Sequence, residues 1–227
     1  MGDGERYDGQ AGWYESFASA ELFAEARRDA VRLLGHGPGR CLDLGCGTGR
    51  AVPLLAEAGW EVIGVDLSCD QLAVAEREVG QLAERFVVAD AHELPFDDCS
   101  FDAVVSILTH TDLDDPRVVF FEARRVLRPA GSFVYLGVHP CFGSPAVERR
   151  EAGPALLHAE YRRAGWQTES RNFSPTGIRS RVGINHLPLA GFLNALVASG
   201  LVFETFEEPG DLDPPLFLAV RARACKP

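Results

Sequence analysis

The stretch from Cys41 to Arg50, which reads CLDLGCGTGR, constrains the fold of this chain more than any other. A largely apolar run typical of a buried β-strand ends abruptly in glycines at positions 45, 47 and 49, and a helix-like segment follows. Gly45 permits a tight turn, and Gly47 lets the backbone approach a ligand without an intervening side chain. The order of strand, glycine turn and helix predicts an α/β domain that binds a ligand at the carboxyl end of the strand.

The spacing of the glycines narrows the class of ligand. A dinucleotide fingerprint would place Gly or Ala at position 50, where this chain has Arg50. Here each glycine is two residues from the next, and Asp43 stands two residues before the first. Two further strand-like segments carry the carboxylates Asp66 and Asp90 at their ends. A carboxylate roughly 20 residues past the glycines can accept hydrogen bonds from both ribose hydroxyls, which predicts a nucleoside-containing ligand.

Three more segments follow at regular intervals: 94–96 (LPF), 100–106 (SFDAVVS) and 126–132 (VLRPAGS). Together with the two preceding patterns, they resemble the class I S-adenosylmethionine (SAM) methyltransferases, of the ubiquinone-biosynthesis-like, "methyltransferase domain 11" type. Ala130 departs from the family pattern, which has glycine there. The resemblance is close over 40–138 and holds in outline over 188–222. It implies a Rossmann-like, seven-stranded, mostly parallel sheet with helices on both faces and a last strand inserted antiparallel between the fifth and sixth.

The resemblance also implies a SAM site, with S-adenosylhomocysteine (SAH) as the product. The glycines approach the methionine part, Asp43 fixes the loop or meets the amino group through water, and Asp66 takes the ribose. Asp90 receives the adenine amino group, and Tyr14 touches the cofactor or, equally well, fills the core. The residues expected to bind SAM are Tyr14, Asp43, Gly45, Gly47, Gly49, Asp66, Leu67, Asp90, Ala91, Ser106 and Ile107.

The periodicity of the apolar residues and the positions of Gly and Pro predict the helices and strands of one domain spanning 1–227. Strands are expected at 40–44, 61–66, 85–89, 102–107, 132–138, 201–207 and 216–222, and helices at 11–34, 50–58, 69–79, 116–126 and 188–199. Ser68 is expected to cap the third helix, and Asp115 with Pro116 to open the fourth. Asp112, Asp114 and Asp115 are an alternative Mg²⁺ site, but capping is the simpler interpretation, so no metal is expected.

Residues 1–36 are expected to form a helical cap, and 139–187 an insertion after the fifth strand. The insertion is rich in Gly and Pro and poorly periodic, which is typical of a functional loop. Its seven arginines and four glutamates give it a net charge of +3 and leave −14 on the rest of the chain. A basic lid on an acidic body predicts an anionic acceptor, with Arg179 and Arg181 as ligands.

Imidazoles are the best candidates for a general base near neutral pH. His139 ends the fifth strand beside the expected cleft and is the first candidate, and His186 at the end of the insertion is the second. His110, after the fourth strand, is expected to contact the acceptor. A structural role is the alternative for each of the three.

Composition excludes other classes of protein. The net charge of −11 argues against nucleic acid as a partner, and no apolar run approaches the length of a membrane span. The six cysteines show no zinc-type spacing, which favours reduced thiols in a cytoplasmic protein. Lys226 is the only lysine among 22 basic residues, a bias that hints at a GC-rich bacterial genome.

The sequence therefore predicts a SAM-dependent methyltransferase, monomeric or homodimeric, that acts on a small molecule such as a metabolite or a secondary-metabolite intermediate. O-, N-, S- and C-transfer all remain open. The alternatives are a SAM-fold enzyme with a non-methylating reaction such as cyclisation, and a non-catalytic SAM-binding protein.

Overall fold

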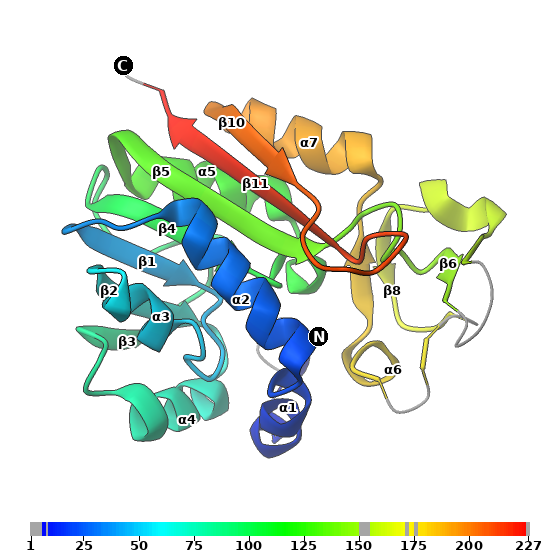
Figure 1. Cartoon of the computed structure of the whole chain (residues 1–227), viewed down its shortest axis with the longest axis horizontal. Helices are drawn as coiled ribbons and strands as arrows, with labels where there is room; N and C mark the ends of the chain where they lie inside the picture. Colours follow the sequence, from blue (N-terminus) through cyan, green and yellow to red (C-terminus); the bar gives the residue numbers. More distant parts are fainter. Residues whose placement is uncertain (1–5, 8, 150–154, 171–172, 175–176, 226–227) are drawn as a thin grey trace.

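A seven-stranded sheet in the order β10-β11-β5-β4-β1-β2-β3 organises the molecule (Figure 1). The computed structural model describes residues 6–7, 9–149, 155–170, 173–174 and 177–225. The strands β1 to β5 run parallel, whereas β11 lies antiparallel between β5 and β10, as expected. Their bounds are β1 Arg40–Leu44, β2 Glu61–Asp66, β3 Arg85–Val88, β4 Phe101–Ile107, β5 Leu127–Val138, β10 Leu201–Glu207 and β11 Phe217–Ala224.

Helices cover both faces of this sheet, and each face has its own apolar core (Figure 1). The helices α2 (Glu21–Leu34) and α3 (Val52–Glu57) bury Ala30 and Leu55 against one face. On the other face, α5 (Pro116–Val126) and α7 (Leu189–Ala198) bury Phe120 and Phe192. The helix α4 (Cys69–Val79) contacts β2 and β3. The predicted doubly covered, mostly parallel sheet is confirmed. The strand order reverses between the neighbouring strands β1 and β4, which is where sheets of this kind bind ligands.

The predicted caps of α4 and α5 are confirmed. Ser68 accepts a hydrogen bond from the Gln71 amide at 3.4 Å, and Asp115 accepts one from the Arg117 amide at 3.0 Å, with Pro116 in the first turn. Each side chain satisfies an amide that the first helical turn would leave unpaired. The two caps therefore fix the residues at which α4 begins after β2 and α5 begins after β4.

Three expected boundaries were wrong. The helix predicted over 11–34 is two helices, α1 (Ala11–Ala18) and α2, because the Arg27 guanidinium donates to the Ala18 carbonyl at 2.9 Å and ends α1 there. The helix predicted over 50–58 is limited to α3. The strand β5 begins five residues early, at Leu127, and Ala130 at φ 66° marks an irregularity within it.

The insertion consists of short elements beside the sheet (Figure 1). In its described part, β6 (Val147–Glu148) pairs with β7 (Leu156–Leu157), and β8 (Gly165–Gln167) pairs with β9 (Ile184–His186). Two further pieces are a 3₁₀ turn at Ala159–Arg162 and the one-turn α6 (Arg179–Val182). The buried Asn185 anchors the insertion, because its amide donates to the carbonyls of Leu113 and Asp114 at 2.7 and 2.9 Å.

The N-terminal segment crosses from α4 to the insertion. The Gly9 amide donates to Asp70 on α4 at 2.8 Å. On the other side, the Arg181 guanidinium lies 4.3 Å from the centre of the Trp13 ring.

In the described part of the chain, no helix is both long and apolar enough to cross a membrane.

Candidate active site

The turn after β1 forms the floor of the site. The amides of Gly45 and Cys46 both donate to the Val65 carbonyl, at 2.8 and 2.9 Å, which ties the turn to β2. Gly45 and Gly47 adopt φ values of 72° and 54°, a region that favours glycine. A Cβ on Gly45 would clash with the Thr109 methyl group, whereas a Cβ on Gly47 would meet nothing closer than 3.7 Å. Gly45 therefore permits close packing of the β4 loop, and Gly47 leaves space for a ligand.

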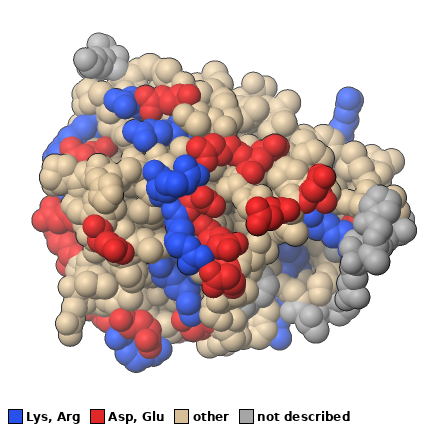
Figure 2. All heavy atoms as spheres, viewed as in Figure 1, with Lys and Arg blue, Asp and Glu red and all other residues tan. Residues whose placement is uncertain are grey.

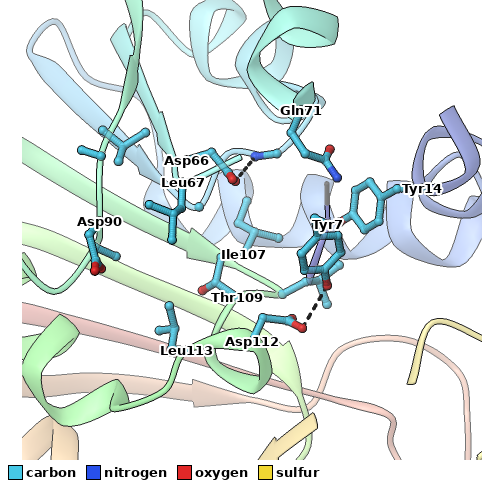
Figure 3. A pocket seen from close by; sticks show the side chains of 16 residues that line it. Tyr7, Tyr14, Asp66, Leu67, Gln71, Asp90, Ile107, Thr109, Asp112 and Leu113 are labelled. Atoms are coloured by element: carbon cyan, nitrogen blue, oxygen red, sulfur yellow. Dashed lines mark hydrogen bonds between the residues drawn. The ribbon is translucent and has the colours of Figure 1, made fainter. Parts of the chain in front are cut away.

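A pocket of about 730 Å³, its solvent-open mouth included, lies over this turn (Figure 3). Asp90 lies at one end and Tyr14 at the other, with Asp66 between them. The predicted cofactor residues that line it are Tyr14, Gly45, Gly47, Asp66, Leu67, Asp90, Ala91 and Ile107. The structure thus brings together residues from α1 and from the ends of β1, β2, β3 and β4.

Asp66 is partly buried at the end of β2, where it holds the glycine turn and also faces the pocket. Its two carboxylate oxygens accept hydrogen bonds from the amides of Gly47 and Ser68, at 2.8 and 2.9 Å. Burial raises the pKa of Asp66, while these amides act in the opposite direction. A carboxylate has about four acceptor sites, so capacity remains for the two ribose hydroxyls that the sequence assigns to Asp66.

A smaller polar recess adjoins the pocket and shares Tyr14, Gly45, Ile107 and Leu108 with it. Asp43 lines this recess, together with Arg27 and Arg50. Burial and the nearby Asp66 raise the pKa of Asp43 to about 7, although Arg27 lowers it. In the described part of the chain, the buried Asp43 Oδ2 and Gln71 Oε1 have no hydrogen-bond partner.

These features fit SAM. The partnerless oxygens of Asp43 and Gln71 are suited to the donors of a cationic amino-acid end. The carboxylates of Asp66 and Asp90 suit hydroxyl and amino groups, and the apolar lining residues Leu67, Ala91, Ile107 and Leu113 suit a flat ring. Figure 3 shows the side chains of Asp66, Gln71 and Asp90 around the same pocket.

Comparison with known proteins agrees with the site. Residues 42–135 match the family described as methyltransferase domain. In sequence these residues are similar to a methyltransferase domain, and in fold the chain is similar to SAM-dependent methyltransferases. The crystal structure of a SAM-dependent methyltransferase from Mesorhizobium loti superposes with a TM-score of 0.72 at 28% identity, over 87% of this chain and 97% of that one. SAM is therefore the cofactor of this domain.

Two curated relatives match the same region. The demethylmenaquinone methyltransferase of Renibacterium salmoninarum is 37% identical over 119 residues, which cover 52% of this chain and 49% of the relative. The O-methyltransferase cnsE of Penicillium expansum is 34% identical over 131 residues, which cover 54% and 48%. The chain thus spans about half the length of these relatives.

Two predicted cofactor residues of the methyltransferase domain lie behind the pocket rather than in its wall. A Cβ on Gly49 would come within 2.8 Å of Val79, so this glycine permits packing of the turn against α4. Ser106 is buried in β4 and forms a hydrogen bond with Thr109. Both therefore shape the loops that carry the lining residues.

A second pocket, of about 570 Å³, adjoins the SAM pocket. Both pockets are lined by Tyr7, Tyr14, Leu108 and Asp112. We call the second one the acceptor pocket; its other lining residues are Ala18, Phe23, Val138, Ile178, Arg179, Leu216 and Phe217. Of the two predicted acceptor-binding arginines, Arg179 lines it, whereas Arg181 is exposed and lies over Trp13.

The two histidines predicted as bases do not line either pocket. In His139, Nδ1 accepts from the Cys141 amide and Nε2 bonds to Glu208, both at 3.0 Å. In His186, Nε2 donates to the Tyr161 carbonyl at 2.7 Å. Burial lowers the pKa of both rings. Their geometry is that of groups that fix the insertion on the sheet.

His110, predicted to contact the acceptor, is buried behind the pocket. Its Nδ1 lies 2.5 Å from the Tyr135 hydroxyl, and its ring packs against Phe192. Burial, with Arg179 and His186 nearby, lowers its pKa to about 3, so the ring is neutral. This histidine fills the core between β5 and α7.

Several lining residues were missed by sequence reasoning. Tyr7 lies in the predicted N-terminal cap, in which only Tyr14 was singled out, and Asp112 was considered only as an unfavoured metal ligand. Leu108 lines both pockets and the polar recess with φ 63°, a strained value for a residue with a side chain. Leu108 was not among those missed, because the family resemblance already implied that the residues directly after β4 lie beside the cofactor. Within the described residues, no cluster of three or more His, Cys, Asp or Glu could hold a metal ion.

Proposed function

We propose that this protein transfers the methyl group of SAM to a small molecule held in the acceptor pocket. The observation that carries the proposal is the continuity of the two pockets, which share four lining residues. SAM supplies a methyl group already activated by a sulfonium leaving group. The protein must therefore chiefly bind the acceptor beside it and exclude water.

The walls of the acceptor pocket suit those two tasks. Phe23 and Phe217 are stacked obliquely with ring centroids 6.3 Å apart, and they form an apolar wall with Val138 and Leu216. The rings of Tyr7 and Tyr14 meet edge to face at 5.6 Å where the two pockets join. Such walls orient an apolar acceptor and keep water from the sulfonium.

The names of the relatives support a small-molecule acceptor. One is named for demethylmenaquinone and the other as an O-methyltransferase. The predicted anionic acceptor depended on an excess of arginine. Figure 2 shows basic and acidic side chains lying side by side on one face of the molecule, rather than a basic field. Inside the acceptor pocket, Arg179 is paired with Asp112, which favours a neutral acceptor.

Calorimetry and mass spectrometry test the proposal together. Purified protein should bind SAH and not NAD, and incubation with SAM and pooled metabolites should yield SAH and a product heavier by one methylene unit. A product of unchanged mass, formed while SAM is not converted to SAH, would point to the non-methylating alternative. Absence of SAH binding would overturn the assignment of the pocket.

A further inference from the structure

The acceptor pocket has one polar end. Its described polar side chains are Tyr7, Tyr14, Asp112 and Arg179, and its remaining lining residues are apolar. Three of these four also line the SAM pocket. A molecule that fills the acceptor pocket is therefore largely apolar and brings its polar group to the junction of the two pockets.

The guanidinium of Arg179 already donates three hydrogen bonds within the protein. It donates to Asp112 Oδ1 at 2.8 Å, to Thr111 Oγ1 at 2.6 Å and to the Gly183 carbonyl at 3.2 Å. The side chains of Arg179 and Asp112 are 18% and 19% exposed, so their charges compensate each other away from bulk water. An anionic acceptor would enter beside Asp112 without surplus positive charge, which disfavours it.

Asp112 retains capacity to accept a hydrogen bond. Its Oδ1 accepts from Arg179 and from the Tyr7 hydroxyl, the latter at 2.9 Å (Figure 3). Its Oδ2 accepts from the Thr111 hydroxyl at 3.2 Å. Burial and Asp112 raise the pKa of Tyr7 well above its usual range, so Tyr7 stays a donor. Because each carboxylate oxygen has two acceptor sites, Oδ2 can take one more donor.

We propose that the acceptor is a neutral, largely apolar molecule that presents a hydroxyl group to Asp112, and that Asp112 takes the hydroxyl proton during methyl transfer. This inference rests on the proposed function. The acceptor oxygen bonds to the methyl carbon, the carbon–sulfur bond breaks with its electron pair on sulfur, and the proton passes to the carboxylate. Arg179 and Tyr7 are positioning residues that hold Asp112 at the junction of the pockets.

Three probes that differ in one group test the inference without an identified acceptor. These are 2-naphthol, 2-methoxynaphthalene and 2-naphthoate, which are a hydroxyl donor, its methyl ether and an anion. In calorimetry on SAH-saturated protein, 2-naphthol should bind about tenfold more tightly than the ether, because a hydrogen bond to a charged group is worth at least that factor. It should also bind more tightly than the naphthoate.

Two variants and a control separate this role from a structural one. In Asp112→Asn, the preference for naphthol over the ether should disappear, and naphthoate affinity should rise because Arg179 loses its counter-charge. The double variant Asp112→Asn with Arg179→Gln should prefer 2-naphthol neither to the ether nor to the naphthoate. Because both charges are removed, it leaves no unpaired charge in the pocket. Asp114→Asn, at a half-exposed carboxylate on the same loop, should match the wild type.

Failure of the inference about Asp112 can be told apart from failure of the proposed function. If SAH binds but the ether binds as well as 2-naphthol, or none of the three probes binds, the inference about Asp112 is wrong. It is equally wrong if naphthoate binds best to wild type and Arg179→Gln abolishes that binding. Loss of SAH binding itself, or no methylated product from any acceptor, would instead overturn the proposed function.

Discussion

Gly45 and Gly47 stand two residues apart in the same turn but serve different purposes. Both have positive φ, yet a Cβ on Gly45 would strike Thr109, whereas one on Gly47 would project into the space of the pocket. The sequence predicted a tight turn at Gly45 and approach to a ligand at Gly47, but the motif does not show which neighbour each glycine faces. Contacts of the β4 loop decide that, and they depend on the tertiary fold.

Alanine substitutions separate strain from ligand approach. Gly47→Ala should leave the protein folded, with about 1 kcal/mol of backbone strain, and should lower SAH affinity at least tenfold. Gly45→Ala should instead lower the melting temperature. Gly210→Ala is the matched control, because Gly210 has φ 90° with nothing within 4 Å of its Cβ position. If Gly47→Ala and Gly210→Ala bind SAH equally well in calorimetry, the turn does not approach the cofactor.

Asp43 makes the stability of the ligand-free protein depend on pH. Its pKa in the folded protein, about 7, lies above the ordinary 3.8, so the folded state binds a proton more tightly than the unfolded state. The resulting stabilisation is fully present below pH 3.8 and is lost as the pH rises through 7. Asp43→Asn should remove this loss, of the order of a few kcal/mol, in urea unfolding at pH 5 and 8. As a control, Asp211→Asn, at an exposed position, should retain the wild-type pH dependence of stability. If wild type, Asp43→Asn and Asp211→Asn all show the same dependence, the pKa of Asp43 is not raised in the folded protein.

At the scale of elements, local chemistry made most of the fold predictable. Ser68 and Asp115 cap their helices where the sequence predicts, because capping needs only side chains within three residues. The break between α1 and α2 was missed, because Arg27 ends α1 from nine residues away by bonding the Ala18 carbonyl. Most of the predicted cofactor residues line the SAM pocket, because they follow the ends of successive parallel strands, which meet at one edge of the sheet. The acceptor side was not, because its residues come from α1, the β4 loop, β5 and the insertion.

At the end of β5, the position of His139 in the chain favours a catalytic role, whereas its contacts favour a structural one. His139 ends β5 as expected, but the Cys141 amide and Glu208 engage its ring nitrogens. Burial lowers its pKa below the ordinary 6.5, although Glu208 acts to raise it. The neutral ring therefore contributes stability that is present above pH 6.5 and is lost as the pH falls.

His139→Gln should accordingly lower the melting temperature at pH 8 and flatten its decline at acidic pH. SAH affinity and the rate of methyl transfer should change less than twofold, because the ring does not line either pocket. His36→Gln, at an exposed position, is the control for both measurements. A fall of tenfold or more in kcat with unchanged stability would restore His139 as a candidate base.

At the scale of the whole molecule, the N-terminal segment and the insertion hold each other beside the acceptor pocket. The Arg6 guanidinium lies 3.7 Å from the centre of the Trp166 ring, and Arg181 lies over Trp13 at 4.3 Å. Ile178 and Arg179 line the acceptor pocket from the insertion, as Tyr14 does from α1. This part of the acceptor pocket is thus assembled from segments more than 150 residues apart in the chain.

This arrangement predicts that α1 and α6 open together. An exposed cation–π contact contributes about 0.5–1 kcal/mol, so Arg181→Ala should speed hydrogen exchange about two- to fivefold in both helices and leave α3 unchanged. Arg77→Ala, which removes an exposed arginine on α4, should not alter exchange in α6. SAH should slow exchange in α1 of the wild type, because Tyr14 lines its pocket. If Arg181→Ala speeds exchange in α6 alone, the two segments open independently, and access to the acceptor pocket is controlled by the insertion without the N-terminal helix.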